Sequence, residues 1–125
     1  MNNMPHVDIY YKEPEVLREQ HTTITSVLCD MLPRQLTCVD DAGEPILVKP
    51  EMVKIRFIVG SQYDTHTKDF EVRVFARDFK SRRPHYQSYS NELQDAIGHH
   101  LPQGSTINVL YVPITAFAAG VAVGT

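Results

Sequence analysis

Hydrophobic and polar residues alternate in four stretches of the chain, and each alternation predicts a β-strand. β-Branched and aromatic residues recur there at every second position. The stretches are 6–11, 53–59, 69–77 and 106–112. In the second stretch the alternation puts Lys54 and Arg56 on the face opposite the apolar side chains. We therefore expect strands with one face turned to a core and one to solvent.

Two intervening stretches have the helical period instead. Pro14, flanked by two glutamates, is typical of a helix start, and Pro33 of a helix that ends just before it. The apolar face of this first helix recurs at spacings of four and three residues: Leu17, His21, Ile24, Leu28 and Met31. A second helix is predicted by Tyr86, Tyr89, Leu93, Ile97 and His100 or Leu101, with Pro102 and Gly104 ending it.

The segments between these elements are polar. Residues 36–48 predict a short hairpin-like insert, in which 37–39 and 46–48 flank the turn residues 40–44. A longer polar turn covers 60–68, and the basic loop that contains Arg82 and Arg83 is most simply solvated.

The order of elements is strand-helix-strand, repeated once in residues 5–59 and 69–112. This layout predicts an α+β domain over residues 1–125, with a four-stranded mixed sheet and both helices on one face. The other face carries charged residues together with Phe75, and an apolar tail follows from Ile114 to Val123. A surface of this mixed character favours an oligomer.

Composition excludes several classes of function. The chain has 125 residues, a formal net charge of -3 and a pI near 6.0, which argues against a partner made of nucleic acid or an anionic membrane. Neither a signal peptide nor a run of roughly 20 apolar residues is visible, so we expect a cytoplasmic protein. Cys29 and Cys38 form no CxxC motif and are expected to be reduced thiols.

Metal binding is also not favoured. His99 and His100 are adjacent, so on a helix their side chains point about 100° apart and chelate poorly. Their place at the end of a predicted helix is explained by the helix dipole. Of Tyr10 and Tyr11, we expect one in the core and one on the sheet surface.

Short motifs along the chain resemble the tautomerase superfamily. Residues 4–7, Met-Pro-His-Val, look like the start of 5-carboxymethyl-2-hydroxymuconate isomerase. Lys49-Pro50, Ser88-Tyr89-Ser90 and Ile107-Asn108 look like macrophage migration inhibitory factor, and strand 55–58 is similar to the arginine-bearing strand of 4-oxalocrotonate tautomerase. The motifs keep a common order over most of the chain, although 36–48 and 60–68 match less well.

The resemblance implies a homotrimer with an active site at each subunit boundary and no metal or organic cofactor. It implies a tautomerase or isomerase that moves a proton next to the carbonyl of an unsaturated 2-oxo or 2-hydroxy acid. Members of the superfamily begin with a proline that removal of the initiator methionine exposes. Pro5 would then be the general acid/base, and residues 1–4 would be an unprocessed or non-native extension.

The resemblance also implies the substrate-binding residues. Arg56 would grip a substrate carboxylate, Lys49 matches an active-site lysine, and Arg77 and Asn108 match positions that line the pocket. The residues alone leave a solvated-surface role open for Lys49, Arg56 and Arg77, and an ordinary strand position open for Asn108.

Two other functions stay open. The chain is a non-catalytic trimeric ligand- or partner-binding protein of this fold if residues 1–4 keep the Pro5 nitrogen in an amide bond. Alternatively, it is a ferredoxin-like ligand-binding module, since βαββαβ also describes that fold. Antiparallel pairing of the two halves, with the amino terminus far from Arg56, would favour the latter.

Overall fold

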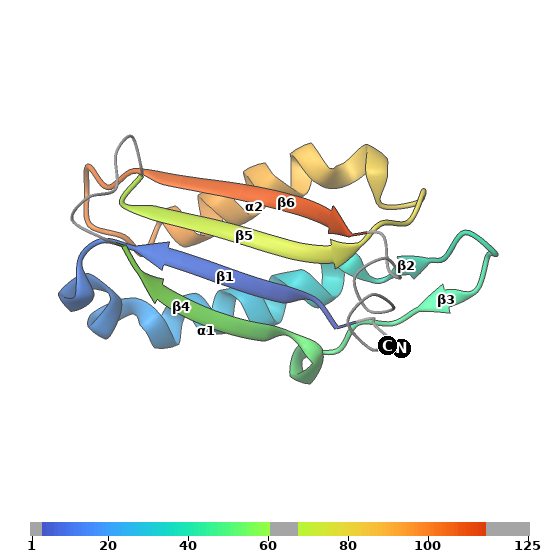
Figure 1. Ribbon diagram of the computed structural model, residues 1–125, viewed down its shortest axis with the longest axis horizontal. Helices are drawn as coiled ribbons and strands as arrows, with labels where there is room; N and C mark the ends of the chain where they lie inside the picture. Colours follow the sequence, from blue (N-terminus) through green and yellow to red (C-terminus); the bar gives the residue numbers. More distant parts are fainter. Residues whose placement is uncertain (1–3, 61–67, 115–125) are drawn as a thin grey trace, which may run out of the picture.

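The computed structural model describes residues 4–60 and 68–114 (Figure 1). The elements in chain order are β1 (His6–Tyr11), α1 (Pro14–Leu36), β2 (Cys38–Val39), β3 (Pro45–Ile46), η1 (Pro50–Met52), β4 (Lys54–Val59), β5 (Phe70–Arg77), η2 (Arg83–His85), α2 (Tyr86–Gly98) and β6 (Ile107–Ile114). The four predicted long strands and both helices are therefore present.

The four long strands form one mixed sheet in the order β4-β1-β5-β6. Within each half the helix carries the chain back beside the strand it left, so β1 pairs with β4 and β5 with β6 in parallel. Antiparallel pairing of β1 with β5 joins the halves, with His6 opposite Phe75. The halves thus pair antiparallel, which is the first condition of the ferredoxin-like alternative. Its second condition is not met by the described residues, because Asp8, close behind Pro5, is the register partner of Arg56.

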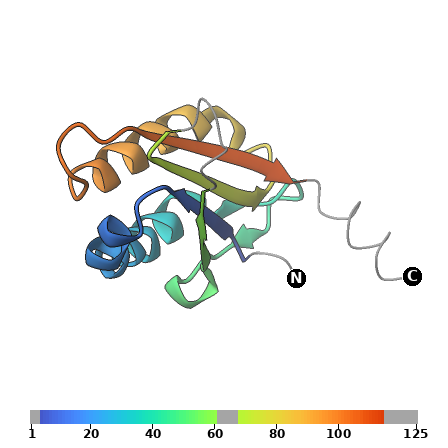
Figure 2. The ribbon, with the colours of Figure 1, turned by 60° about the vertical axis from the view of Figure 1, so that its left-hand side comes forward.

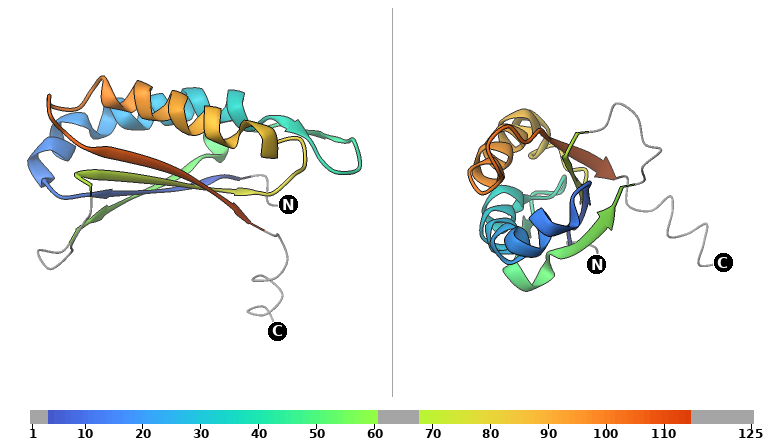
Figure 3. Two further views of the ribbon diagram at one scale, coloured as in Figure 1. Left: turned by 90° about the horizontal axis from the view of Figure 1, so that it is seen from above. Right: turned by 90° about the vertical axis from the view of Figure 1, so that its left-hand side faces the viewer.

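Both helices cover the same face of the sheet, as Figure 3 shows. The core between the two layers is made of apolar side chains: Val7, Ile9, Ile24, Leu28, Leu32, Leu36, Val48, Phe70, Val72, Val74, Ala76, Leu93, Ile97 and Val109. No helix in the described part of the chain covers the opposite face, which we call the open face. The predicted α+β class, with four strands and two helices on one side, is confirmed.

The prediction that the first helix ends before Pro33 is wrong. α1 continues to Leu36 although Pro33 offers no N–H to the preceding turn. Leu32, Pro33 and Leu36 are all buried, and the Thr37 N–H donates to the Pro33 carbonyl at 3.1 Å. Burial of the last turn thus outweighs the missing hydrogen bond. His21, predicted on the apolar face, is exposed.

Arg82 is a second correction, because it is buried rather than solvated, with an exposed fraction of only 2%. Its Nε and Nη2 donate to the carbonyl of Leu36 at 3.1 and 2.7 Å, and Nη1 donates to the carbonyl of Arg77 at 2.7 Å. The last carbonyls of a helix lack intrahelical donors, and Arg82 supplies one from a distant loop. Arg83 is exposed as predicted and pairs with Asp78 at 2.8 Å.

The hairpin in the insert is confirmed, with β2 and β3 antiparallel. Asp40 organises its turn by accepting hydrogen bonds from the backbone N–H groups of Ala42 and Glu44 at 2.9 Å each. Gly43 adopts a positive φ of 86° in this turn, which suits glycine.

The last strand runs beyond its predicted end to Ile114, and Pro113 is tolerated because β6 is an edge strand.

Residues 115–123 of the predicted apolar tail and most of the polar turn lie outside the described residues. Cys29 and Cys38 are free thiols and partly buried, as expected. Within the described ranges, neither helix combines the length and apolar character that crossing a bilayer requires.

Candidate active site

Pro5 lies directly before β1 and is buried. Its carbonyl accepts a hydrogen bond from the Lys54 N–H at 3.0 Å, which ties it to the start of β4. Met4 precedes it and is exposed by 45%. In the chain as printed, the Pro5 nitrogen is a tertiary amide and has no basic lone pair. If the chain began at Pro5, its free amine would lie at this same end of the sheet.

Lys49 and Arg77 are placed at the same end of the sheet as Pro5. Lys49 is exposed and precedes η1, which leads directly into β4 beside the start of β1 (Figure 2). Arg77 follows Phe75, the partner of His6, at the end of β5. Its guanidinium lies 5.2 Å from the centre of the Phe79 ring. Two of the predicted binding residues thus share one sheet end with Pro5.

Arg56 projects from β4 on the open face, where it meets Asp8 of β1. Arg56 Nε donates to Asp8 Oδ1 and Nη2 donates to Oδ2, both at 3.2 Å. The Arg56 side chain is 63% exposed, whereas that of Asp8 is only 7% exposed. The predicted arginine is therefore held by a carboxylate of its own chain.

His6 contacts the same carboxylate. Its Nε2 lies 2.7 Å from Asp8 Oδ1, and its ring meets Phe75 edge-on with centroids 5.9 Å apart. Burial by itself raises the pKa of the Asp8 carboxyl, but the hydrogen bonds and charges of Arg56 and His6 outweigh it and hold the pKa below its usual value. Asp8 is thus a buried carboxylate on a face that no described helix covers.

Asp8 and His6 are functional candidates that sequence reasoning missed. The available signal was the alternation of β1, which puts both side chains on one face. The partner was out of reach, because Arg56 lies 48 residues further along the chain. Only the order of the strands reveals that the three side chains meet.

A second ion pair lies beside the first on the open face. Arg73 Nε donates to Glu71 Oε2 at 2.5 Å, and the guanidinium of Arg73 lies 4.6 Å from the centre of the Tyr10 ring. Counting charged side chains on the face from β1, β4 and β5 gives four cations against two carboxylates: Lys54, Arg56, Arg73 and Arg77 against Asp8 and Glu71. This surface favours anions although the whole chain carries -3.

Asn108 is separated from the other predicted residues. It pairs with Glu71, which pairs with Tyr10 near the far end of β1. Five residues along a strand separate that position from Pro5, or about 17 Å at the usual rise. Within one chain, Asn108 therefore does not share a pocket with Pro5, and its predicted role requires a neighbouring subunit.

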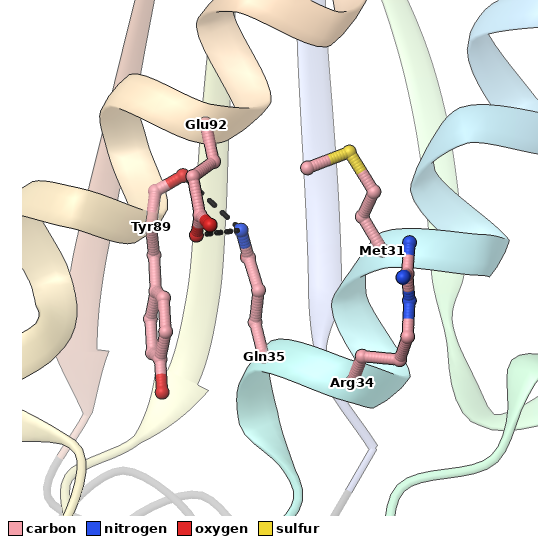
Figure 4. Close-up of a pocket in the computed structure, with 5 residues that line it drawn as sticks. All are labelled: Met31, Arg34, Gln35, Tyr89 and Glu92. Carbon is pink, nitrogen blue, oxygen red and sulfur yellow. Dashed lines mark hydrogen bonds between the residues drawn. The ribbon is translucent and has the colours of Figure 1, made fainter.

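A pocket of about 240 Å³ lies on the other side of the molecule, between α1 and α2 (Figure 4). It is lined by Met31, Arg34, Gln35, Tyr89 and Glu92, none of which was predicted as a site residue. Among residues 4–60 and 68–114, no group of three or more His, Cys, Asp or Glu side chains could hold a metal ion.

The polar groups of this pocket join its walls. Gln35 Nε2 donates to the carbonyl of Tyr89 at 3.2 Å and to Glu92 Oε1 at 3.4 Å (Figure 4). The Tyr111 hydroxyl in turn donates to Gln35 Oε1. Burial raises the pKa of Tyr111, so its hydroxyl keeps the proton that it donates. These bonds connect α1, α2 and β6, which indicates a role in packing.

Comparison with known proteins supports the fold. No protein-family model matches the sequence, and no curated protein matches it significantly. A Vibrio cholerae protein of unknown function has a similar structure, with 15% identity, 94% of this chain and 83% of that chain covered, and a TM-score of 0.59. A domain of unknown function from Sebaldella termitidis follows, with 16% identity, 89% of each chain and a TM-score of 0.50.

A macrophage migration inhibitory factor-like protein from Entamoeba histolytica also matches, with 12% identity, 92% of each chain and a TM-score of 0.48. At such low identities, these likenesses concern the fold alone.

Proposed function

We propose that this protein is a cofactor-independent tautomerase or isomerase in which the nitrogen of Pro5 is the general acid/base. The observation that carries the proposal is the position of Pro5, directly before β1 at the sheet end that Lys49 and Arg77 share. In a chain that begins at Pro5, this nitrogen becomes a secondary amine. Buried surroundings and nearby cations lower the pKa of an amine, which leaves a neutral base near pH 7.

The proposed substrate is an unsaturated 2-oxo or 2-hydroxy acid. Its carboxylate would be attracted by the cationic open face and bound by Arg56, whose side chain is largely exposed despite its contact with Asp8. Pro5 would take a proton from the carbon beside the carbonyl, and the cations would stabilise the enolate that forms.

The proposed assembly is a homotrimer, with each site at a subunit boundary. Asn108 would then enter the site from a neighbouring subunit. Leu110 and Ile114 of β6 are 47% and 40% exposed in the single chain, and they would gain cover in such an assembly. Sedimentation equilibrium tests this assembly, and a monomer at micromolar concentration would contradict it.

The decisive experiment compares two forms of one sequence. A protein shown by intact mass to begin at Pro5 is expected to ketonise phenylenolpyruvate or a 2-hydroxydienoate. The matched control keeps residues 1–4, so its Pro5 nitrogen is an amide, and it should be slower by about 10²–10⁴-fold, the usual contribution of a general base. Equal rates from both forms, or no turnover from either, would contradict the proposal.

A second function is favoured by one observation, the amide bond between Met4 and Pro5 in the chain as printed. If the protein from its native gene keeps residues 1–4, we propose a non-catalytic ligand- or partner-binding protein of the same fold. Intact-mass analysis of untagged native protein separates the two functions.

A further inference from the structure

The guanidinium of Arg56 has two edges that can bind a carboxylate, and Asp8 occupies one of them. A guanidinium carries five N–H donors in a planar fork. Asp8 accepts from Nε and Nη2, which form the side edge. Nη1 has no hydrogen-bond partner among the described residues. The end edge, formed by Nη1 and the second N–H of Nη2, is therefore uncommitted.

Asp8 is itself held firmly. Its side chain is 7% exposed, and both Arg56 and His6 contact its Oδ1 atom. In the sheet its neighbours are Arg56 on β4 and Arg73 on β5, which are its register partners. A buried carboxylate with two partners has little freedom, so the arginine bound to it loses much of its own rotational freedom as well.

We propose that Asp8 is a positioning residue, which holds one edge of Arg56 so that the other edge can bind a ligand carboxylate. The identity of the ligand as a carboxylate rests on the proposed function. Asp8 also adds a negative charge to the site, which by itself weakens the binding of an anion. Positioning of Arg56 strengthens carboxylate binding, whereas the charge of Asp8 weakens it. Removal of this charge therefore shows which of the two effects is larger.

The test is a double-mutant cycle in protein that begins at Pro5. Asp8→Asn, Arg56→Gln and the double variant are compared with the parent in two measurements. One is KM and kcat with phenylenolpyruvate. The other is the dissociation constant of malonate, which calorimetry measures in all four forms. In the parent and in Asp8→Asn, which keep Arg56, the ¹⁵N resonances of the Arg side-chain Nε groups report the same binding. Glu71→Gln is the matched control, because Glu71 pairs with Arg73 on the same face.

Asp8→Asn is expected to raise KM and the malonate dissociation constant about tenfold, with a smaller change in kcat, and to have no effect in the Arg56→Gln background. Glu71→Gln removes a negative charge from the same face without touching Arg56, so it should raise neither value. Tighter or unchanged malonate binding by Asp8→Asn would show that Asp8 only neutralises charge and would overturn the inference. An effect that persists without Arg56, or a parent that does not bind malonate, would overturn it too.

A variant that leaves Asp8 intact guards against misfolding of Asp8→Asn. Arg56→Lys keeps the charge, but its ammonium lacks two carboxylate-binding edges. It should bind malonate as weakly as Arg56→Gln does, and parent-like binding would contradict the inference. Malonate binding does not need the Pro5 nitrogen. Absence of turnover would therefore sink the proposed function, while the malonate cycle would still decide the role of Asp8.

Discussion

The two faces of the sheet bury side chains by different means. The covered face is filled by apolar residues under α1 and α2, and Val7, Ile9, Val72 and Val74 have no exposed surface. On the open face, Asp8 is almost as buried, although the side chains around it are polar and no described helix covers it. Its carboxylate is contacted by Arg56 of β4 and by His6 of its own strand, and Arg73 of β5 is its register partner.

The covered face stabilises the fold, whereas the open face is suited to binding a ligand. Apolar burial is non-directional and stabilises in proportion to the area removed from water. A buried ion pair gains little net stability, because desolvation offsets the attraction between the charges. The open face therefore holds its charged groups in a fixed arrangement at a low net gain in stability. Such an arrangement is what recognition of an anion requires.

The largest effect should come from the covered face. Leu28→Ala removes a side chain with no exposed surface and should cost about 2–5 kcal/mol of unfolding free energy through lost burial and a cavity. Leu110→Ala, at a side chain that is 47% exposed on the open face of the single chain, is the control, and in the monomer it should cost less than about 1 kcal/mol. Urea unfolding followed by circular dichroism measures both. Equal losses of unfolding free energy in the two variants would mean that the covered face contributes no more to stability than the open face.

The next effect tests the polar burial. Asp8→Asn keeps the shape of the side chain but replaces charge-assisted hydrogen bonds by neutral ones, and it places an amide N–H₂ where Arg56 or His6 donates. We expect a loss of about 1–2 kcal/mol in the same urea assay. No loss would mean that Asp8 contributes nothing to stability and is retained for another reason.

The covered face was also the part that sequence could predict. Periods of two and of about 3.6 residues reflect local geometry, so the strands, both helices and the hairpin of the insert follow from them. Pro33 misled the prediction of the end of α1, since local preference argued for a stop while burial of Leu32 and Leu36 carried the helix on. Arg82 was missed because its acceptor, the carbonyl of Leu36, lies 46 residues away.

The candidate site was predictable only in part. Pro5 and Arg56 followed from the resemblance of two short motifs to the tautomerase superfamily, and the alternation in β4 added that Arg56 lies on the polar face. Asp8 sits between Val7 and Ile9 and reads as one polar residue in a strand. Its importance depends on which strand lies beside it, and strand order is a property of the whole fold. The role proposed for Asn108 would depend on a neighbouring subunit, because within one chain Asn108 lies far from Pro5.

A smaller effect compares two tyrosines on opposite faces. Tyr111→Phe removes the hydroxyl that donates to the buried Gln35 and should cost about 1 kcal/mol, the usual net value of a hydrogen bond. Tyr10→Phe keeps the ring under Arg73 and should change stability by less than about 0.5 kcal/mol. Thermal unfolding of the two variants measures the difference. A larger loss for Tyr10→Phe would mean that its hydroxyl has an essential contact on the open face.

The smallest change is expected from pH, because every atom stays in place and only protons are added. The pKa of Asp8 is lower in the folded protein than in the unfolded chain, where an Asp titrates near 3.9. The Asp8 charge therefore contributes stability that is present above about pH 4 and is lost as pH falls through the lower, folded pKa.

Asp69 and Asp78 have lowered pKa values as well, so acid destabilises the parent protein through several carboxylates at once. The difference in unfolding free energy between the parent and Asp8→Asn isolates the contribution of Asp8, since the other carboxylates are common to both. This difference should be constant from pH 7 to about pH 5 and shrink between pH 4 and pH 2. A difference that persists at pH 2 would mean that the cost of Asp8→Asn comes from the amide N–H₂ that faces Arg56 and His6, and not from the lost charge.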